Sequence, residues 1–558
     1  MFSRYPLAML AGLLLACAFP NLSIAGLAWL VPGLILLIAI GQPPKQVFRL
    51  GFVAGFAHRL ASLAWLLNIP VAWVPMLGWA ALSAYCALYT GVWTWLCWRA
   101  FPVSLPGLSG NQGLRQLSQA FLSTSWSQRF MWALHGAMFW VGLELLISRL
   151  FSGFPWNLLG ASQYTLVPLL HIASVTGIYG ISFLLVWSSL SLVCAVMAIV
   201  ARPGNRSAWV AEIILPMSVV GLIYGLGYSR ALAPEPKRPE LSIAMIQPSI
   251  PQTMIWSDSE NSNRFRQVLE LSLESLTNHP DLMIWPEAAV PGILRFDEDI
   301  AKPISDLART NHIPIILGAD DAKPLEGART FQGADFYNAS FLIGPDGRLG
   351  SVYKKRNLVI FGEYIPLVKW FPFIKYLTPI PGAFTPGESP VPFRLPNPQF
   401  NVSVLICFED GFPDLVREYV SEDTDFLVNI TNDGWFGEAS AQRQQAAAAV
   451  FRAVENGVPL LRCANTGLTC WIDEQGRIRQ FFSSPNGGIY GRGFLIARVP
   501  SLVPGQHRRM TFYHQHGDVF GWICFGVTAL RILRIVISSR RQRRESIAVT
   551  PPEAAAKG

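Results

Sequence analysis

Two patterns of hydrophobic and polar positions divide the chain. Residues 1–232 hold long apolar runs with few charges, whereas short apolar runs alternate with polar stretches from residue 241. A helix that spans a bilayer needs about 20 mostly apolar residues, and eight runs come close to that length. They lie near 6–19, 22–40, 51–68, 76–98, 131–148, 166–199, 209–229 and 518–538. The pattern predicts a polytopic α-helical membrane bundle of about eight spans, in which 166–199 is one tilted helix or a helix with an interfacial start.

The N-terminus also allows another interpretation. Arg4 followed by an apolar run is typical of a cleavable signal peptide, and residues 14–17 resemble a lipoprotein cleavage box. Because further apolar runs follow at once, we favour an uncleaved first helix.

Basic residues predict the orientation of the bundle, because Lys and Arg concentrate in cytoplasmic loops. With eight spans and both termini in the cytoplasm, the basic ends fall on one side and residues 230–517 lie outside the cytoplasm. These ends carry Arg4, Lys45, Arg49, Arg99, Arg115, Arg129, Arg202, Arg206 and the arginines from Arg540 to Arg544. The stretch 100–130, rich in Ser, Gln and Gly, is predicted to be a cytoplasmic loop.

From residue 241 the pattern predicts a second, α/β domain. Short apolar strands are expected at 241–246, 281–285, 313–317, 338–343, 402–407 and 426–430, with helices at 258–278 and 440–456. Buried strands that alternate with helices indicate a layered α/β fold. The expected domains are a seven-helix membrane domain over 1–232, an extracytoplasmic domain over 233–510, a final transmembrane helix over 511–540 and a cytoplasmic tail over 541–558.

Composition agrees with a membrane protein. Only 14% of the 558 residues are charged and 51% are hydrophobic, against about 25% charged in soluble domains. The net charge of +8 comes without a basic stripe or a nucleic-acid motif, so we expect no nucleic-acid partner. The eight cysteines show no Cys/His ligand spacing, so neither a metal site nor a disulfide framework is predicted. Whether Cys463 and Cys470 pair stays open.

Three polar residues stand at strand ends, where α/β folds keep their chemistry. They are Glu287, Lys355 and Cys407. A carboxylate can accept the thiol proton, the thiolate can attack a carbonyl, and a lysine can stabilise the oxyanion. Each residue alone also has a simpler interpretation. Glu287 could cap the next segment, Lys355 could be a solvated cation, with Lys354 beside it as a competing choice, and Cys407 could be a buried packing residue.

The sequence motifs around these residues resemble those of a known family. Trp285-Pro-Glu287, Tyr353-Lys-Lys355 and Cys407-Phe-Glu409 resemble the nitrilase superfamily, whose members use a Glu-Lys-Cys triad in an αββα sandwich. Longer words at 357–366, 429–437, 452–455 and 462–467, and at 153–157 and 160–163 in the membrane part, narrow the resemblance to the apolipoprotein N-acyltransferase family.

The resemblance implies residue roles. Glu287 would be the general base, Lys355 the oxyanion-stabilising cation and Cys407 the acylated nucleophile. Supporting or substrate-binding residues would be Glu363, which orients the triad and the amine, Glu409, which supports the cysteine loop, Trp256 on a substrate loop, and Phe408. Three positions depart from the family pattern, namely Ile360, Phe408 and Gln445.

The resemblance also implies a reaction. An acyl chain would pass from a membrane phospholipid, through a Cys407 thioester, to the α-amine of a diacylglyceryl-cysteine apolipoprotein. The enzyme would be a cofactor-free monomer in the bacterial inner membrane, with its catalytic domain on the periplasmic side. The alternatives are a membrane-anchored amidase with the same triad and a non-enzymatic membrane scaffold.

Two hypotheses concern the membrane part. Trp73, Trp156 and Trp256 would line a lipid entry region. Glu144, an ionisable residue inside an apolar run, is either a functional residue or, as we favour, a structural partner for Arg149.

Overall fold

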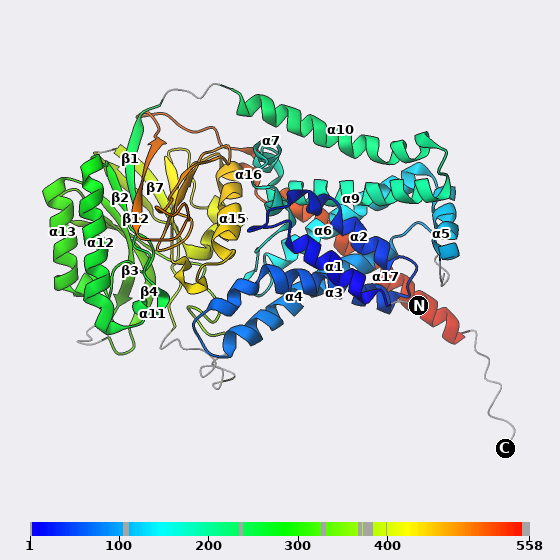
Figure 1. Ribbon diagram of the computed structural model, residues 1–558, viewed down its shortest axis with the longest axis horizontal. Coiled ribbons are helices and arrows are strands. Elements are labelled where there is room, and N and C mark those ends of the chain that lie inside the picture. Colours follow the sequence, from blue (N-terminus) through cyan, green and yellow to red (C-terminus); the bar gives the residue numbers. More distant parts are fainter. Residues whose placement is uncertain are drawn as a thin grey trace, which may run out of the picture.

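The structure is a computed structural model that describes residues 3–103, 111–233, 238–324, 331–366, 371, 383–397 and 399–548. The molecule is elongated, with a helical bundle at one end and a two-sheet sandwich at the other (Figure 1). The part of the predicted tail beyond residue 548 lies outside the described residues.

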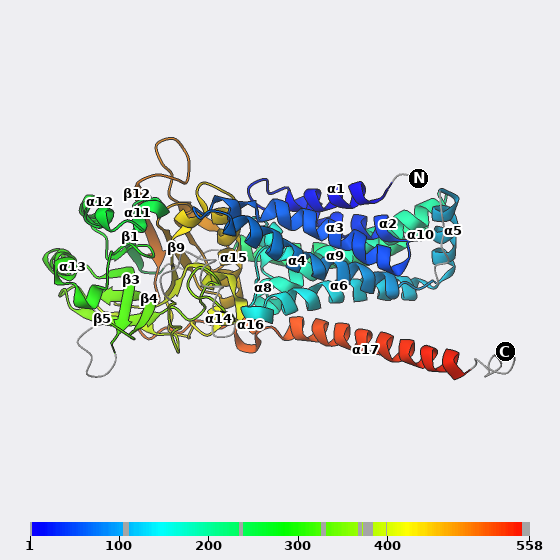
Figure 2. The same ribbon diagram turned by 90° about the horizontal axis from the view of Figure 1, so that it is seen from below.

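Within the described residues, eight helices run along the bundle, and α5 (Asn111–Ser123), α7 (Val167–Leu170) and α8 (Ala173–Thr176) lie in its connections. Helix α3 packs on α1 and α4, while α6 packs on α9 and α17. Figure 2 shows α17 running along one side of the bundle. The helices are α1 (Tyr5–Ala16), α2 (Val31–Ala39), α3 (Pro44–Ser62), α4 (Val74–Arg99), α6 (Trp126–Ile147), α9 (Ile178–Ala201), α10 (Arg206–Ala231) and α17 (Val519–Ala548).

The predicted number of about eight spans is not confirmed. Within the described part of the chain, four helices are long and apolar enough to cross a membrane: α6, α9, α10 and the segment Val519–Ser538 of α17. Helix α1 has 12 residues and α2 has nine, which is short of the roughly 20 that a span needs. Helix α3 carries Lys45, Arg49 and Arg59.

Two segments of the bundle differ in detail from the sequence patterns. The run 166–199 begins with the short helices α7 (Val167–Leu170) and α8 (Ala173–Thr176), and α9 starts only after Gly177, whose φ is +66°. The predicted loop 100–130 contains helix α5 (Asn111–Ser123). Leu117 and Phe121 are buried, and their spacing of four residues places them on one helix face, which explains why this polar stretch is helical.

The predicted pairing of Glu144 with Arg149 is wrong. Oε1 of Glu144 accepts hydrogen bonds from Nε1 of Trp140 at 2.8 Å and from the backbone N–H of Leu159 at 2.7 Å. Arg149 instead pairs with Asp518 and, at 3.2 Å, with Asp414 of the sandwich. Glu144 therefore supports the turn that follows the 153–157 loop, which agrees with a structural role.

The sandwich consists of two six-stranded mixed sheets. The first has the order β12-β1-β2-β3-β4-β5 and the second β11-β10-β9-β8-β7-β6. Cys463 and Cys470 are free thiols buried in the second sheet. The strands are β1 (Glu240–Gln247), β2 (Leu282–Ile284), β3 (Ile315–Lys323), β4 (Asp335–Ile343), β5 (Leu349–Lys354), β6 (Pro392–Pro396), β7 (Gln399–Ile406), β8 (Phe426–Thr431), β9 (Leu460–Ala464), β10 (Cys470–Ile472), β11 (Ile478–Phe481) and β12 (Gly493–Pro500).

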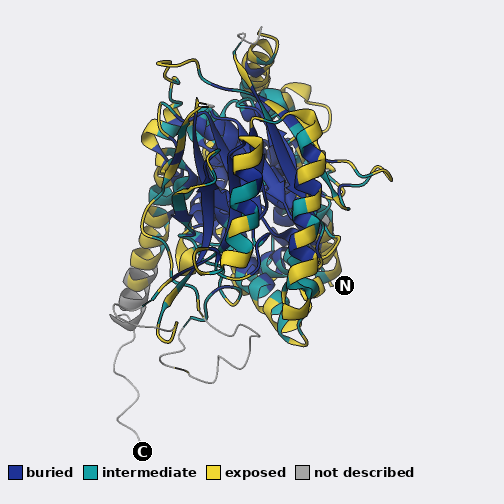
Figure 3. Ribbon diagram, turned by 90° about the vertical axis from the view of Figure 1, so that its left-hand side faces the viewer, coloured by how far each residue is buried: buried dark blue, intermediate teal, exposed yellow. Residues whose placement is uncertain are grey.

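Helices cover both outer faces of the sandwich. Helices α12 (Asn261–Ser275) and α13 (Glu298–Asn311) lie outside the first sheet, and Figure 3 shows them half-exposed over buried strands. Helix α15 (Ala441–Asn456) packs on β9 and β10 of the second sheet and faces the bundle (Figure 1). This order of layers is the predicted αββα sandwich, and it places α15 between the second sheet and the membrane helices.

Candidate active site

The three candidate residues follow strands at one edge of the sandwich. Glu287 comes three residues after β2, Lys355 directly follows β5, and Cys407 directly follows β7 as the first residue of the 3-10 helix η9 (Cys407–Gly411). The backbone beside Glu287 is closely packed. A Cβ at Gly318 would lie 2.7 Å from the Cα of Glu287, so only glycine fits on β3 at this point.

Lys355 lies between two carboxylates. Its Nζ is 2.8 Å from Oε1 of Glu363 and 3.5 Å from Oε1 of Glu287, and its side chain is 1% exposed. Nδ2 of Asn338 donates to the same two oxygen atoms, at 2.7 Å each. The backbone N–H of Asn432 donates to the other oxygen of Glu287 at 2.9 Å. Both carboxylates are therefore fixed by shared donors.

The electrostatics of the site follow from burial and from these charges. Burial raises the pKa of Glu287, the Lys355 charge opposes that shift, and the Glu363 charge adds to it. Burial alone would lower the pKa of Lys355, but the charges of Glu363 and Glu287 reverse this and raise it. Burial raises the pKa of the Cys407 thiol, and the Glu287 charge raises it further, while the Lys355 charge lowers it. At neutral pH the thiol is therefore protonated and needs a base to ionise it.

Backbone strain collects at the same place. Cys407 has φ +54°, Ala288 beside Glu287 has +53°, and Phe361 near Glu363 has +60°. A left-handed conformation costs a residue with a Cβ about 1–2 kcal/mol, and such strain is often held at functional sites. The turn at Cys407 ends β7 and starts η9, so Cys407 lies at a sharp bend.

Glu409 holds the cysteine loop against the lysine loop. Its side chain is fully buried, and Oε1 accepts from the backbone N–H groups of Arg356 at 2.8 Å and Asn357 at 3.1 Å. Oε2 accepts from the backbone N–H of Ile406 at 2.8 Å, and the Tyr353 hydroxyl donates to both oxygens. This carboxylate therefore connects the end of β7 with the residues after β5.

The other candidate residues lie around this centre. Phe408 packs on Trp156 of the membrane domain, with ring centroids 5.5 Å apart. Trp256, at the end of helix α11 (Gln252–Ile255), is 44% exposed and packs edge-on against Trp435. The three tryptophans of the lipid-entry hypothesis have different environments, because Trp156 is buried and Trp73 is 81% exposed.

The structure distinguishes the two adjacent lysines. Lys355 points to the carboxylates, whereas Nζ of Lys354 lies 3.4 Å from the ring centroid of Tyr337 and 4.0 Å from Asp321. Successive side chains on a strand point to opposite faces, and both residues lie at the end of β5. Of these two lysines, only Lys355 therefore faces Glu287 and Glu363.

Sequence reasoning missed several residues that complete the site. The sequence pattern places Asn338 only at the start of a strand, although a polar side chain in an apolar strand is a signal of a buried polar contact. Gln445, noted only as a departure, donates from Nε2 to the Cys407 carbonyl at 2.8 Å. Beneath it, buried Arg462 pairs with Asp410 at 2.9 Å and with Asp433 at 2.7 Å.

Known proteins similar to this chain cover both of its domains. The family model described as carbon-nitrogen hydrolase matches residues 242–485, and that described as apolipoprotein N-acyltransferase N-terminal domain matches residues 11–191. An apolipoprotein N-acyltransferase from Geobacter metallireducens is 34% identical, over 97% of this chain and 96% of its own length. One from Rhizobium rhizogenes is 29% identical, over 95% of each chain. Among solved structures, an amidase from Nesterenkonia sp. aligns at 16% identity with a TM-score of 0.35, over 48% of this chain and 92% of its own.

Proposed function

Because this chain belongs to the apolipoprotein N-acyltransferase family, we propose that Cys407 carries an acyl chain as a thioester between a phospholipid donor and a lipoprotein acceptor. Membership makes the chain a membrane acyltransferase that acts on lipoproteins. The observation that carries the proposed mechanism is Lys355, which is buried between Glu287 and Glu363 and whose charge opposes the rise in the pKa of the Cys407 thiol.

The first half-reaction forms the thioester. Glu287 accepts the thiol proton, and the sulfur attacks the ester carbonyl carbon of the phospholipid. The ammonium of Lys355 stabilises the negative oxygen of the tetrahedral intermediate. The C–O ester bond then breaks, and the glycerol oxygen takes the proton back from Glu287. A lysophospholipid leaves, and the acyl group stays on sulfur.

The second half-reaction uses the same groups. The neutral α-amine of a diacylglyceryl-cysteine attacks the thioester carbonyl, and Glu287 accepts a proton from the nitrogen. The C–S bond breaks, the new amide leaves, and the thiolate regains its proton from Glu287. Ping-pong kinetics follow from the covalent intermediate.

The architecture supports this reaction at a bilayer surface. The sandwich is joined to α10 at one end and to α17 at the other, so the catalytic domain stays beside the membrane that holds both lipid substrates. This confinement replaces a search in three dimensions by positioning. Glu287, Lys355 and Cys407 are all supplied by one sandwich, which supports our proposal that the enzyme works as a monomer.

We place the enzyme in the inner membrane with the sandwich on the periplasmic side. The helix ends remote from the sandwich carry a series of basic residues, which the positive-inside rule assigns to the cytoplasm. These are Arg4, Lys45, Arg49, Arg99, Arg129, Arg202 and Arg206.

Intact-mass analysis of the purified protein after incubation with phospholipid vesicles tests the proposal. We expect an acyl-sized mass gain that hydroxylamine removes and that Cys407→Ala abolishes. Adding a diacylglyceryl-cysteine peptide should then discharge the acyl group onto the peptide amine. Release of free fatty acid instead would favour the amidase alternative, and the absence of any mass gain would refute the acyl-carrier role.

A further inference from the structure

Gln444 on α15 joins the sandwich to three separate segments of the membrane domain. Its Oε1 accepts from the indole N–H groups of Trp65 at 3.2 Å and Trp156 at 2.7 Å. Its Nε2 donates to the backbone carbonyls of Pro20 at 2.9 Å and Ser62 at 3.1 Å. The side chain is 4% exposed. An amide has two donors and two acceptor sites, and here all four are used across the domain boundary.

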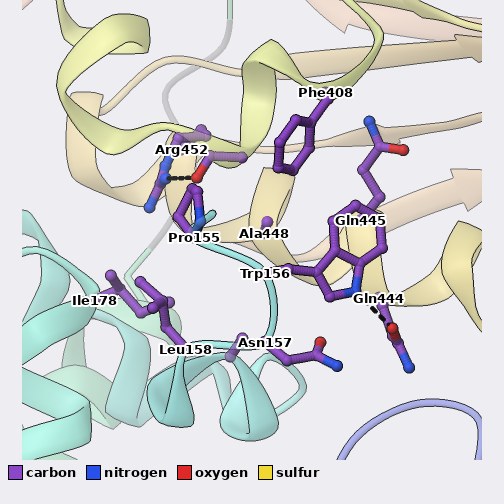
Figure 4. A pocket seen from close by; sticks show the side chains of 12 residues that line it. Pro155, Trp156, Asn157, Leu158, Ile178, Phe408, Gln444, Gln445, Ala448 and Arg452 are labelled. Carbon is purple, nitrogen blue, oxygen red and sulfur yellow. Dashed lines mark hydrogen bonds between the residues drawn. The ribbon is translucent and has the colours of Figure 1, made fainter. Parts of the chain in front are cut away.

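The next residue along the helix holds the nucleophile loop. Nε2 of Gln445 donates to the backbone carbonyl of Cys407 at 2.8 Å and to Oδ1 of Asp410 at 3.0 Å. Its Oε1 accepts from buried Arg462 at 3.1 Å. Figure 4 shows Gln444 and Gln445 leaving α15 in different directions, one toward Trp156 and the other away from it.

These contacts form a closed circuit. Cys407 is followed by Phe408, whose ring packs on Trp156. The indole N–H of Trp156 donates to Gln444. Gln445, the next residue after Gln444, donates to the backbone carbonyl of Cys407 and so closes the circuit. Four residues of the circuit, namely Phe408, Trp156, Gln444 and Gln445, line part of a narrow cavity of about 10 Å³ between the two domains (Figure 4). A shift of the membrane segments is therefore passed to the cysteine through both a ring contact and a hydrogen-bonded helix.

We propose that Gln444 is a positioning residue that aligns the nucleophile loop with the membrane domain, so that the ester of a bilayer-held acyl donor meets Cys407. The inference rests on the proposed acyl transfer. It predicts that Gln444 affects reaction with lipid in a membrane and leaves reaction with small molecules dissolved in water unaffected.

Other contacts keep the domains together when Gln444 is changed. Oε1 of Glu455 accepts from the backbone N–H of Ile178 at 2.8 Å, and Arg149 lies 3.2 Å from Asp414. Loss of the Gln444 amide should therefore shift the domain boundary without separating the domains. A displacement of about 1 Å at a reacting centre can cost on the order of 100-fold in rate.

The test compares Gln444→Met with wild-type full-length enzyme in phospholipid vesicles. Acyl loading from the vesicle phospholipid is measured beside alkylation of Cys407 by iodoacetamide, which requires no membrane docking. Gln442→Met is the matched control, because Gln442 lies on the same helix but donates only within the sandwich, to the carbonyls of Asp433 and Gly437. If Gln442→Met disturbs only the packing of α15, phospholipid loading and alkylation of Cys407 should fall by the same factor in this control.

For Gln444→Met we expect kcat for phospholipid loading to fall about 10- to 100-fold, with alkylation within about threefold of wild type. Equal losses in both assays, or no loss in either, would overturn the inference. If this variant does not fold, Trp156→Phe removes one of the four hydrogen bonds, keeps the ring on Phe408, and should show the same selective loss at smaller size. Failure of the wild-type enzyme to load phospholipid would instead refute the proposed function.

Discussion

Replacing Glu363 by Gln should move the acidic limb of the pH–rate profile to lower pH. Oε1 of Glu363 and Oε1 of Glu287 each lie 2.7 Å from Nδ2 of Asn338, so they cannot be more than about 5.4 Å apart. At an effective dielectric constant of about 20, two like charges at that distance repel by about 3 kcal/mol. Lys355 and the amide offset part of this repulsion, and the remainder is what the Glu363→Gln change removes, so the acidic limb should move clearly to lower pH.

The sign follows from the role of Glu287. A general base works in its ionised form, and both burial and the Glu363 charge raise the pKa of Glu287. Removing that charge lowers the pKa, so Glu287 stays ionised to lower pH. A weaker base also accepts a proton less readily, and we expect the plateau rate to fall about 10-fold.

The assay is the initial rate of lysophospholipid release from vesicles between about pH 4 and pH 9. This range starts near the ordinary carboxyl pKa and extends above it, which is the direction in which burial moves the pKa of Glu287. Glu418→Gln serves as the control, because Glu418 is an exposed carboxylate paired with Arg356 at 2.8 Å and should leave the profile unchanged. An acidic limb that stayed in place or moved to higher pH in Glu363→Gln would refute the assignment of Glu287 as the titrating base.

Three further predictions concern single buried contacts. Asn338→Leu removes a hydrogen bond that lowers the pKa of Glu287. In the same assay the acidic limb should therefore move to higher pH, opposite to its movement in Glu363→Gln. Glu409→Gln leaves at least one backbone N–H without its acceptor; thermal unfolding should show a loss of about 2–4 kcal/mol, with slower alkylation of Cys407, and an unchanged melting temperature would contradict this. Arg129→Met leaves Glu212 buried without its partner at 2.6 Å, so the free energy of unfolding measured in detergent should fall by about 3–5 kcal/mol. The double variant with Glu212→Leu should recover most of that loss.

The sandwich and the position of its chemistry could be predicted from local sequence patterns. Strands of five or six apolar residues ended at polar residues, and the carboxyl ends of such strands meet at one edge. That logic places Glu287 and Cys407 each at a strand end, but β2 and β7 lie in different sheets, so the nitrilase-like motifs around the two residues were needed to group them. The side-chain alternation of a strand separates Lys355 from Lys354. These features depend on neighbouring residues, which a pattern records.

The residues that were missed act over long sequence separations. Gln444 contacts Pro20, more than 400 positions away, and no periodicity connects two such sites. The predicted number of spans is not confirmed for a different reason. The run 22–40 is apolar throughout, but the chain forms a 3-10 turn at Ala25–Trp29 before α2 begins, and hydropathy does not distinguish a continuous helix from a broken one.

The pairing of β1 with β12 has a consequence for how the protein is assembled. The first and last strands of the sandwich are antiparallel neighbours, with Glu240 opposite Pro500, so the chain enters and leaves this domain at one point. A domain with adjacent ends can fold as an insertion in its host. During synthesis, α17 can dock on α6 only after residues 232–518, which follow α10, have been made. Each doubling of such a loop costs only about 0.6 kcal/mol in closure entropy. A sandwich exchanged between relatives at this strand pair would therefore keep the path of the membrane helices, but it would also have to supply the partners that Gln444, Glu455 and Asp414 give to the membrane domain.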